Sequence, residues 1–251
     1  MRSGKENAEC FLFFAKNYRV GIVMAERVTM AVIARIHSDF KEKFGIPRQS
    51  GLVNELEAKI VFEPEYRSVH ALSGMEGYSH VWLLWQFSEN VERGWSPTVR
   101  PPRLGGNRRV GVFATRSPFR PNAIGLSSVR LLRVEKSEEF GPVLYVSGAD
   151  LMDGTPILDI KPYIPLTDCH IEASGGYSEE NADYHLSVHF PKHLLQRVEG
   201  EKRDALLAVL AEDPRPAYQN DSTRIYGMCF AEHEIKFRVE GKSLYVLDVV
   251  L

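Results

Sequence analysis

Short stretches rich in β-branched and aromatic residues recur along the chain, separated by glycine, proline and aspartate. Most are too short for a typical helix, and no regular helices alternate with them. This pattern favours an antiparallel sheet that curls or closes into a barrel over a parallel, doubly wound sheet. The predicted strands of this first part are residues 28–37, 57–62, 80–87, 109–115, 126–134, 143–148 and 184–190.

The pattern changes after Pro191. Residues 192–212 place leucine and valine among charged residues, with the spacing of one amphipathic helix or two short ones. The breaker 213–216, Asp-Pro-Arg-Pro, ends this segment. Three more strands are predicted at 225–230, 235–239 and 244–250.

These patterns predict a mainly β protein, with an antiparallel β-barrel followed by a small α+β domain. The expected divisions are an N-terminal extension at 1–27, the barrel domain at 28–190 and the C-terminal domain at 191–251. A chain of 251 residues, 44% of them hydrophobic, is long enough to bury a substantial core.

The chain shows no sign of membrane residence or export. The apolar run at residues 11–15 ends at Lys16, far short of the ~20 residues that span a bilayer. It is also too short for a secretory signal. Three widely spaced cysteines without a C-x-x-C motif fit a reducing compartment. We therefore expect the protein in the cytoplasm.

Charge is distributed very unevenly. Residues 93–134 contain nine arginines and no lysine, aspartate or glutamate, whereas the whole chain has a net charge of −2, so the remaining residues carry −11. A guanidinium group matches phosphate and carboxylate oxygens in a bidentate manner, which an ammonium group does not. Prolines and glycines in the same window predict stiff loops. The window therefore indicates a polyanion-binding surface, although any single arginine is as often solvated or bound to a sheet carbonyl.

A second cluster holds three carboxylates, Asp150, Asp153 and Asp159, within ten residues. The pair Asp153-Gly154 is typical of a hairpin turn whose carboxylate caps backbone N–H groups. Asp159 lies between Leu158 and Ile160, so we expect it to pair with an arginine of the basic window. A divalent metal site is conceivable but no histidine lies within six residues.

Other catalytic signatures are absent from the sequence. It has neither the glycine spacing of a Rossmann dinucleotide site nor a Walker motif, and no G-x-S-x-G nucleophile elbow. Residue patterns alone therefore lead to a β-rich enzyme or binder of a polyanion.

Five segments together resemble the TrmO/YaeB (TsaA-like) family of tRNA (adenine-N6)-methyltransferases. They are residues 43–49 (KFGIPRQ), 100–109 (RPPRLGGNRR), 111–122 (GVFATRSPFRPN), 150–163 (DLMDGTPILDIKPY) and 213–218 (DPRPAY). The resemblance runs from about residue 28 to the C-terminus. It implies a single-sheeted β-barrel that pairs as a homodimer and uses S-adenosylmethionine to N6-methylate threonylcarbamoyladenosine beside the anticodon of tRNA.

The resemblance also implies roles for particular residues. The donor would be bound by Pro47, Arg48, Gln49, Ser88, Glu89, Arg116, Leu126, Leu151, Met152, Asp153 and Gly154. Family members often have other polar residues at Ser88 and Glu89. The anticodon stem-loop would be gripped by Arg108, Arg109 and Arg120, with Phe119 stacking on an unpaired base or simply anchoring its loop.

The methylation needs no covalent nucleophile, because alignment of nitrogen, methyl and sulfur lowers the barrier. The base that takes the acceptor proton is Asp150, Asp153 or the substrate's own carboxylate; the sequence does not distinguish them. Two other functions stay open at this point. One is a non-catalytic RNA-binding or regulatory module, and the other is a metal-dependent phosphodiesterase that uses Asp150, Asp153 and Asp159.

Overall fold

The computed structural model describes residues 26–101, 108–176, 184–216, 219 and 221–251. Residues 31–251 form one compact unit. Its strands are β1 (Ala34–His37), β2 (Glu57–Phe62), β3 (His80–Gln86), β4 (Thr98–Val99), β5 (Val110–Gly111), β6 (Ile124–Ser137), β7 (Gly141–Ser147), β8 (Pro156–Pro162), β9 (Ser187–His189), β10 (Tyr226–Phe230), β11 (His233–Glu240) and β12 (Ser243–Val250). The α-helices are α2 (Pro165–Asp168), α3 (Lys192–Leu195) and α4 (Arg203–Ala211). Short 3-10 helices are η1 (Pro64–Tyr66), η2 (Val69–Leu72), η3 (Met75–Gly77), η4 (Ser88–Arg93), η6 (Val112–Ala114) and η8 (Gly200–Lys202).

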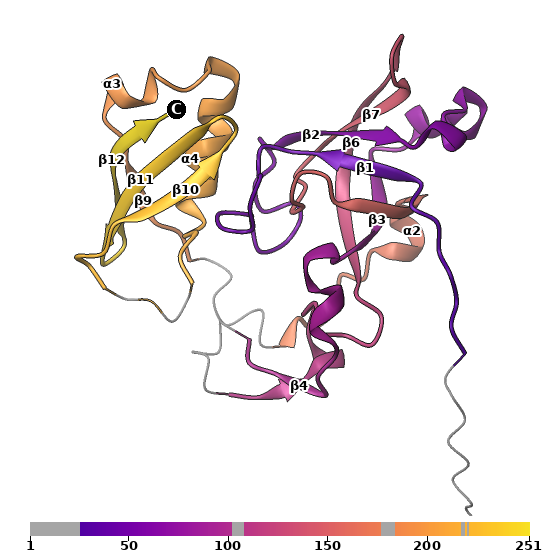
Figure 1. The fold of residues 1–251 in the computed structure, drawn as a ribbon, viewed down its shortest axis with the longest axis horizontal. Helices are drawn as coiled ribbons and strands as arrows, with labels where there is room; N and C mark the ends of the chain where they lie inside the picture. Colours follow the sequence, from indigo (N-terminus) through magenta and orange to yellow (C-terminus); the bar gives the residue numbers. More distant parts are fainter. Residues whose placement is uncertain (1–25, 102–107, 177–183, 217–218, 220) are drawn as a thin grey trace, which may run out of the picture. The chain divides into compact units, whose positions relative to one another are not determined.

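The larger sheet has six antiparallel strands in the order β1-β2-β7-β6-β3-β8, and β8 returns to pair with β1, so that the sheet closes on itself (Figure 1). Burial alternates along β3, where Val81, Leu83 and Trp85 are buried, because successive side chains of a strand point to opposite faces. A Cβ atom at Gly125 of β6 would lie 2.2 Å from the Trp85 ring. Only glycine leaves room for the indole there.

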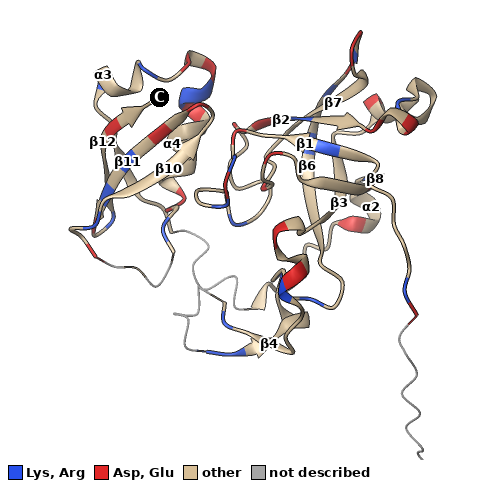
Figure 2. Cartoon of the chain, in the orientation of Figure 1, with Lys and Arg blue, Asp and Glu red and all other residues tan. Residues whose placement is uncertain are grey.

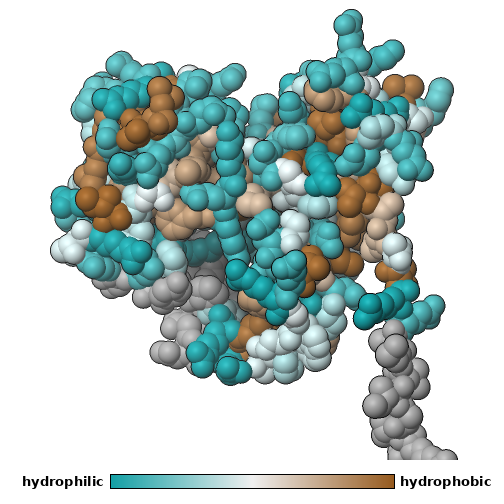
Figure 3. All heavy atoms as spheres, viewed as in Figure 1, coloured by the Kyte–Doolittle hydropathy of each residue, from teal (hydrophilic) through white to brown (hydrophobic). Residues whose placement is uncertain are grey.

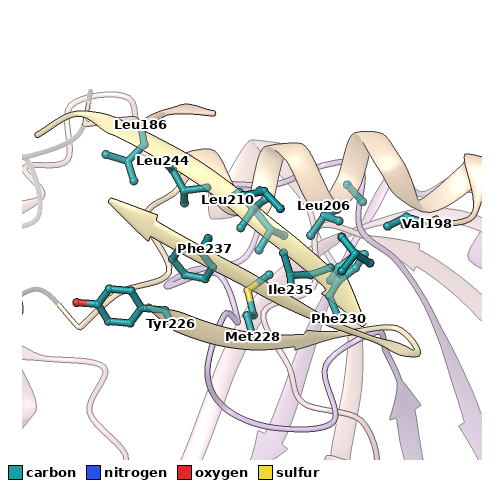
Figure 4. Packing of buried hydrophobic residues seen from close by; sticks show 14 of the residues in the cluster. Leu186, Val198, Leu206, Leu210, Tyr226, Met228, Phe230, Ile235, Phe237 and Leu244 are labelled. Carbon is teal, nitrogen blue, oxygen red and sulfur yellow. The ribbon is translucent and has the colours of Figure 1, made fainter. Parts of the chain in front are cut away.

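The C-terminal residues form a separate four-stranded sheet in the order β10-β11-β12-β9, in which β9 is parallel to β12. Helix α4 covers it, and leucines of the helix meet Phe237, Ile235 and Met228 of the strands in one hydrophobic core (Figure 4). Strand β9 lies before residue 190, the expected domain boundary. The C-terminal sheet therefore recruits residues that the sequence analysis placed in the barrel domain.

The loop between β1 and β2, residues 38–56, packs into that C-terminal core. Phe40, Val53 and Leu56 of this β1–β2 loop are all less than 5% exposed and belong to the same cluster as the residues of β10, β11 and α4. The rings of Phe40 and Phe230 meet edge to face, with their centroids 5.6 Å apart. The loop thus starts and ends on the larger sheet but buries its apolar side chains against the smaller one.

The prediction of a mainly β fold with an antiparallel sheet is confirmed, and several details differ. The expected strand 109–115 is wrong: β5 covers two residues, and the 3-10 helix η6 follows because Val112 buries its side chain and donates its N–H to Pro97 O. Strand β8 was not predicted, since prolines at both of its ends and Asp159 within it mask the strand pattern. The segment 192–212 contains two short helices, α3 and α4.

Hydrophilic residues cover most of the face seen in Figure 3, and hydrophobic residues show there as smaller spots. Within the described residues, no helix has both the length and the apolar character needed to cross a membrane.

Candidate active site

Asp150 lies just after β7 and is the centre of a small polar cluster. Ser127 Oγ donates to its carboxylate at 2.6 Å, and the Trp85 indole N–H donates to Ser127 at 3.0 Å. Burial raises the pKa of Asp150. The Ser127 hydroxyl, the backbone N–H of Asp150 itself, the charge of Arg116 and the N–H of Ser50 act in the opposite direction. Sequence reasoning missed Ser127 and Trp85, because a buried serine and a buried tryptophan carry no functional signal in a strand pattern.

The β1–β2 loop brings Gln49 to Arg116. An Nη of Arg116 donates to the Gln49 side-chain oxygen, and the Gln49 amide donates to the Arg48 carbonyl at 2.6 Å. Gly51 N donates to Gly148 O at 2.9 Å, which ties this part of the loop to the end of β7, two residues before Asp150. The structure therefore assembles three predicted site residues, Gln49, Arg116 and Asp150, around a loop fastened at its middle.

The turn from Leu151 to Gly154 joins the first residues of the same loop. Asp153 accepts from the Ser38 N–H at 3.3 Å and lies 3.2 Å from His37 Nδ1, and its own N–H donates to Phe40 O at 2.8 Å. Gly154 has a φ of 76°, which glycine adopts without steric cost. The predicted turn with a capping carboxylate is present. The prediction of a hairpin is wrong, because β7 pairs with β2 and β6, and β8 with β1 and β3.

The other predicted donor residues occupy varied positions. Pro47 is buried and Arg48 half-buried in the β1–β2 loop, and Met152 is half-buried in the turn. Ser88 and Glu89 open η4, directly after β3, and are exposed. Leu126 is 47% exposed on β6, whose neighbouring residues Gly125 and Ser127 are buried, so its side chain faces outward from the sheet.

The basic window forms a small lobe at residues 95–123, which we call the arginine lobe. Within its described residues, β4 pairs with β5, and Ser96 N donates to Phe119 O, so the two halves of the lobe are joined. Basic residues lie at one end of β4 (Figure 2), where Arg100 follows the strand and Arg109 precedes its partner β5. Arg108, Arg109 and Arg116 are exposed, and Arg109 donates to the Thr98 hydroxyl at 3.0 Å. Residues 102–107 of the predicted basic motif lie outside the described part of the chain.

Not every arginine of the window is free for a polyanion. Arg120 is half-buried and donates to the carbonyls of Val112, at 3.1 Å, and Thr115, at 2.6 Å. Arg133 lies on β6 and forms ion pairs with Glu135 and Glu57. Arg120 therefore matches the other interpretation of a single arginine, in which the guanidinium binds backbone carbonyls instead of a ligand.

The exposed aromatic side chains of the lobe differ from the predicted one. Phe119 is half-buried, whereas Phe113 is 74% exposed and Trp95 is 57% exposed. The Arg120 guanidinium lies over the Phe113 ring, 5.7 Å from its centroid. No sequence pattern separates two phenylalanines six residues apart in one loop, so only the fold reveals which of them faces solvent.

The three carboxylates of the acidic segment have different partners. Asp159 pairs with Lys161 at 2.8 Å, not with an arginine of the basic window as predicted, because it shares β8 with that lysine and both side chains face outward. Asp150 binds Ser127, and Asp153 caps the β1–β2 loop. In the described ranges, no group of three or more His, Cys, Asp or Glu side chains is arranged to hold a metal ion.

Known proteins resemble this chain along most of its length. A family model described as the tRNA-methyltransferase O N-terminal domain matches residues 35–169, and the TrmO C-terminal domain matches residues 183–251. The tRNA (adenine(37)-N6)-methyltransferase of Escherichia coli is 41% identical over 226 residues, which are 86% of this chain and 96% of that protein. A putative S-adenosylmethionine-dependent methyltransferase, RcsF, of Pseudomonas aeruginosa is 40% identical over 234 residues, 88% of this chain and 97% of that protein.

A solved structure extends the resemblance to the fold. The crystal structure of TrmO from Pseudomonas aeruginosa superimposes with a TM-score of 0.72 at 33% identity, and the match covers 90% of this chain and all of that one. Sequence and fold agree over both sheets, and the chain belongs to the tRNA-methyltransferase O family.

Proposed function

We propose that this protein transfers a methyl group from S-adenosylmethionine to the N6 nitrogen of adenine 37 in tRNA, and that the acceptor is threonylcarbamoyladenosine. Family membership supports the reaction, and the cluster of Gln49, Arg116 and Asp150 supports its location. The closed six-stranded sheet serves as a barrel that carries this cluster at its rim.

The residues present fit the chemistry of the donor. The exposed guanidinium of Arg116 complements the carboxylate of the methionyl part. Pro47, Arg48 and Gln49 contribute a stretch of loop that is half-buried or buried before any ligand binds. We assign the same role to the turn Leu151, Met152, Asp153 and Gly154, and we keep Ser88, Glu89 and Leu126 as outer contacts.

The bound donor supplies an electrophilic methyl group on a positively charged sulfur. What the chain contributes is mainly alignment, for which effective molarities of ~10⁵–10⁸ M are attainable when reacting groups are held in line. Gln49 fixes Arg116, and Gly51 and Gly148 fix the loop, so these groups lose little freedom on binding. Asp150 accepts the proton that the acceptor nitrogen releases, because burial makes this carboxylate a stronger base than an ordinary aspartate.

Replacement of Asp150 by asparagine tests this assignment. We expect kcat to fall by about 10²–10³-fold, within the range of general-base effects. In the pH profile of kcat, the acidic limb of the wild type should lie above the ordinary aspartate pKa. This limb should disappear in the variant. Since the folded-state pKa is raised, ionisation of Asp150 destabilises the fold as pH rises from 3.8 through the raised value. The variant should therefore be at least as stable as the wild type at neutral pH, and a wild-type rate in it would reject Asp150 as the base. Asp159→Asn serves as the control: this carboxylate pairs with Lys161 on β8, and its removal should leave kcat unchanged.

The arginine lobe is the surface to which we assign the anticodon stem-loop. Arg108 and Arg109 are exposed and contact phosphates, each adding close to one unit to the salt slope of binding. Arg120 contributes by holding the loop and the Phe113 ring. We move the stacking role from Phe119 to Phe113, which presents an open ring face to an unpaired base.

Three further expectations belong to this proposal. We propose that the protein forms a homodimer. The exposed Leu126, which lies beside Leu84 on the outer face of β6 and β3, supports this proposal, and sedimentation velocity tests it.

We propose a cytoplasmic location, where tRNA is modified. We also propose that the C-terminal domain begins near residue 184 instead of 191, because β9 belongs to its sheet.

One titration separates the methyltransferase from the two alternatives. Calorimetry with S-adenosylmethionine should show binding at micromolar to sub-millimolar concentration, whereas magnesium should give no saturable heat. Binding of tRNA without any binding of the donor or its demethylated product would favour a non-catalytic RNA-binding module. Magnesium-dependent phosphodiester cleavage, lost in Asp159→Asn, would favour the phosphodiesterase.

A further inference from the structure

We infer that the C-terminal domain positions the donor-binding β1–β2 loop, and that Asp213 and Arg215 are the positioning residues that hold it through Arg48. This inference rests on the proposed function, since it gives the second domain a role in donor binding. The chain of contacts runs from Arg215 through Asp213, Arg48 and Gln49 to Arg116.

Apolar residues of the β1–β2 loop make extensive contacts with the C-terminal sheet. Phe44 stacks on Tyr226 and Phe237, with ring centroids 6.4 Å and 6.5 Å apart. Gly45 has a φ of 93°, and a Cβ atom there would lie 2.3 Å from the Met228 sulfur. The segment immediately before Pro47 and Arg48 is therefore shaped to the surface of the C-terminal sheet, and its backbone has little room to move.

Hydrogen bonds fasten the two ends of this segment. Ala231 N donates to Asp39 O at 2.8 Å, and Lys202 pairs with the Asp39 carboxylate at 2.8 Å. At the other end, an Nη of Arg48 donates to the carbonyl oxygen of Asp213 at 3.2 Å. All three partners belong to the C-terminal domain, so the donor residues take their position from it as well as from the larger sheet.

The Asp213 carbonyl is itself held in an unusual backbone conformation. Asp213 has a φ of 53°, in the left-handed region that non-glycine residues rarely occupy. Its carboxylate accepts from Arg215 Nε and Nη2, each at 2.8 Å, and from the Tyr184 hydroxyl at 3.2 Å. Aspartate adopts this conformation more readily than most non-glycine residues, and the bidentate guanidinium holds it in place here. The side chains of Asp213 and Arg215 are 8% and 7% exposed.

Burial argues against a direct role of Arg215 in gripping tRNA. Two of its nitrogens are engaged by Asp213, and only a small fraction of its side chain reaches solvent. A phosphate contact would require this pair to break, which leaves a buried carboxylate without its partner. Direct tRNA binding is the competing outcome of the test below.

The test is calorimetric titration of S-adenosylmethionine, without tRNA, into wild type, Arg215→Gln and the control Arg197→Gln. Arg197 also binds an aspartate of the C-terminal domain, Asp248, at 3.1 Å, but its contacts are to β12. We expect the Kd for the donor to rise about tenfold in Arg215→Gln, in the range of coupling through direct contacts, and to stay unchanged in the control. The affinity for tRNA and its salt slope should match the wild type in both.

Two more variants keep the inference falsifiable. Arg215→Lys retains the charge but not the bidentate fork, so it should bind the donor with intermediate affinity. Tyr184→Phe removes one hydrogen bond to Asp213 and serves if Arg215→Gln does not fold; it should weaken donor binding by about twofold to threefold, as expected for one hydrogen bond. Combined with Gln49→Ala, either change should be less than additive for donor binding.

Unchanged donor affinity in a folded Arg215→Gln, or a loss confined to tRNA binding, would overturn the inference and leave the proposed function standing. A wild-type protein that binds no donor would instead remove the proposed function itself, and the positioning role with it.

Discussion

The β1–β2 loop and the arginine lobe both carry predicted ligand contacts, yet the protein holds them in opposite ways. The loop buries Phe40, Val53 and Leu56 in the core of the C-terminal sheet. The arginine lobe contains a pair of two-residue strands and leaves Phe113 and Trp95 largely in solvent. A small donor that must be aligned for in-line transfer benefits from a fixed loop, whereas a large RNA needs an open surface.

The largest effect should follow from a change at the most tightly packed glycine of the loop. Gly45→Ala introduces a Cβ that overlaps Met228 and places alanine at a φ of 93°, so we expect a loss of about 2–4 kcal/mol in the free energy of unfolding. Urea denaturation measures it. Gly51→Ala is the matched control: its φ is 79°, but nothing lies within 4 Å of the added atom. Equal losses in the two variants would show that packing against the C-terminal sheet contributes nothing.

An intermediate effect is expected in the arginine lobe, and on binding instead of stability. Phe113→Ala removes an exposed ring and should weaken tRNA binding about tenfold, the lower part of the range for a stacked base, with an unchanged Tm. Phe119→Ala should lower the Tm and leave tRNA binding unchanged, because that ring is half-buried. Filter binding and thermal melting of both variants decide. If only Phe119→Ala weakens tRNA binding, the stacking residue is the one that the sequence analysis named.

The smallest effects should come from ion pairs at the edge of the loop. Lys202→Met removes the pair with Asp39, whose side chain is 13% exposed, and should cost about 1 kcal/mol. Lys41→Met removes a pair with Glu232 in which both side chains are more than half exposed, and the melting temperature should not change. Equal shifts in melting temperature would mean that burial does not distinguish these two contacts.

Sequence patterns predicted most strands because enrichment in β-branched and aromatic residues is a local property, as in β3, which contains Val81, Trp82 and Trp85 within seven residues. They failed where tertiary contacts determine the local structure or the partner of a side chain. Val112 lies in a 3-10 turn because it has a buried site to fill, and Asp159 pairs with Lys161 because the two share a strand face.

For the candidate site, the sequence suggested members but not their arrangement. The resemblance named Gln49 and Arg116, and the acidic cluster named Asp150. Their assembly depends on contacts between segments at least 34 residues apart in the sequence. The segment 213–218 was recognised as a motif, but the contact of Asp213 with Arg48 was not predicted. This contact uses a backbone carbonyl, and the sequence does not encode the direction of a carbonyl in any recognisable motif.

The exposure of Trp95 has a practical consequence. Of the three tryptophans, Trp85 is packed against Gly125 inside the sheet and Trp82 donates its indole N–H to Asp168, while Trp95 is 57% exposed in the lobe assigned to RNA. Its fluorescence should be quenched when nucleobases approach, so that unlabelled protein reports the arrival and departure of its substrate in real time.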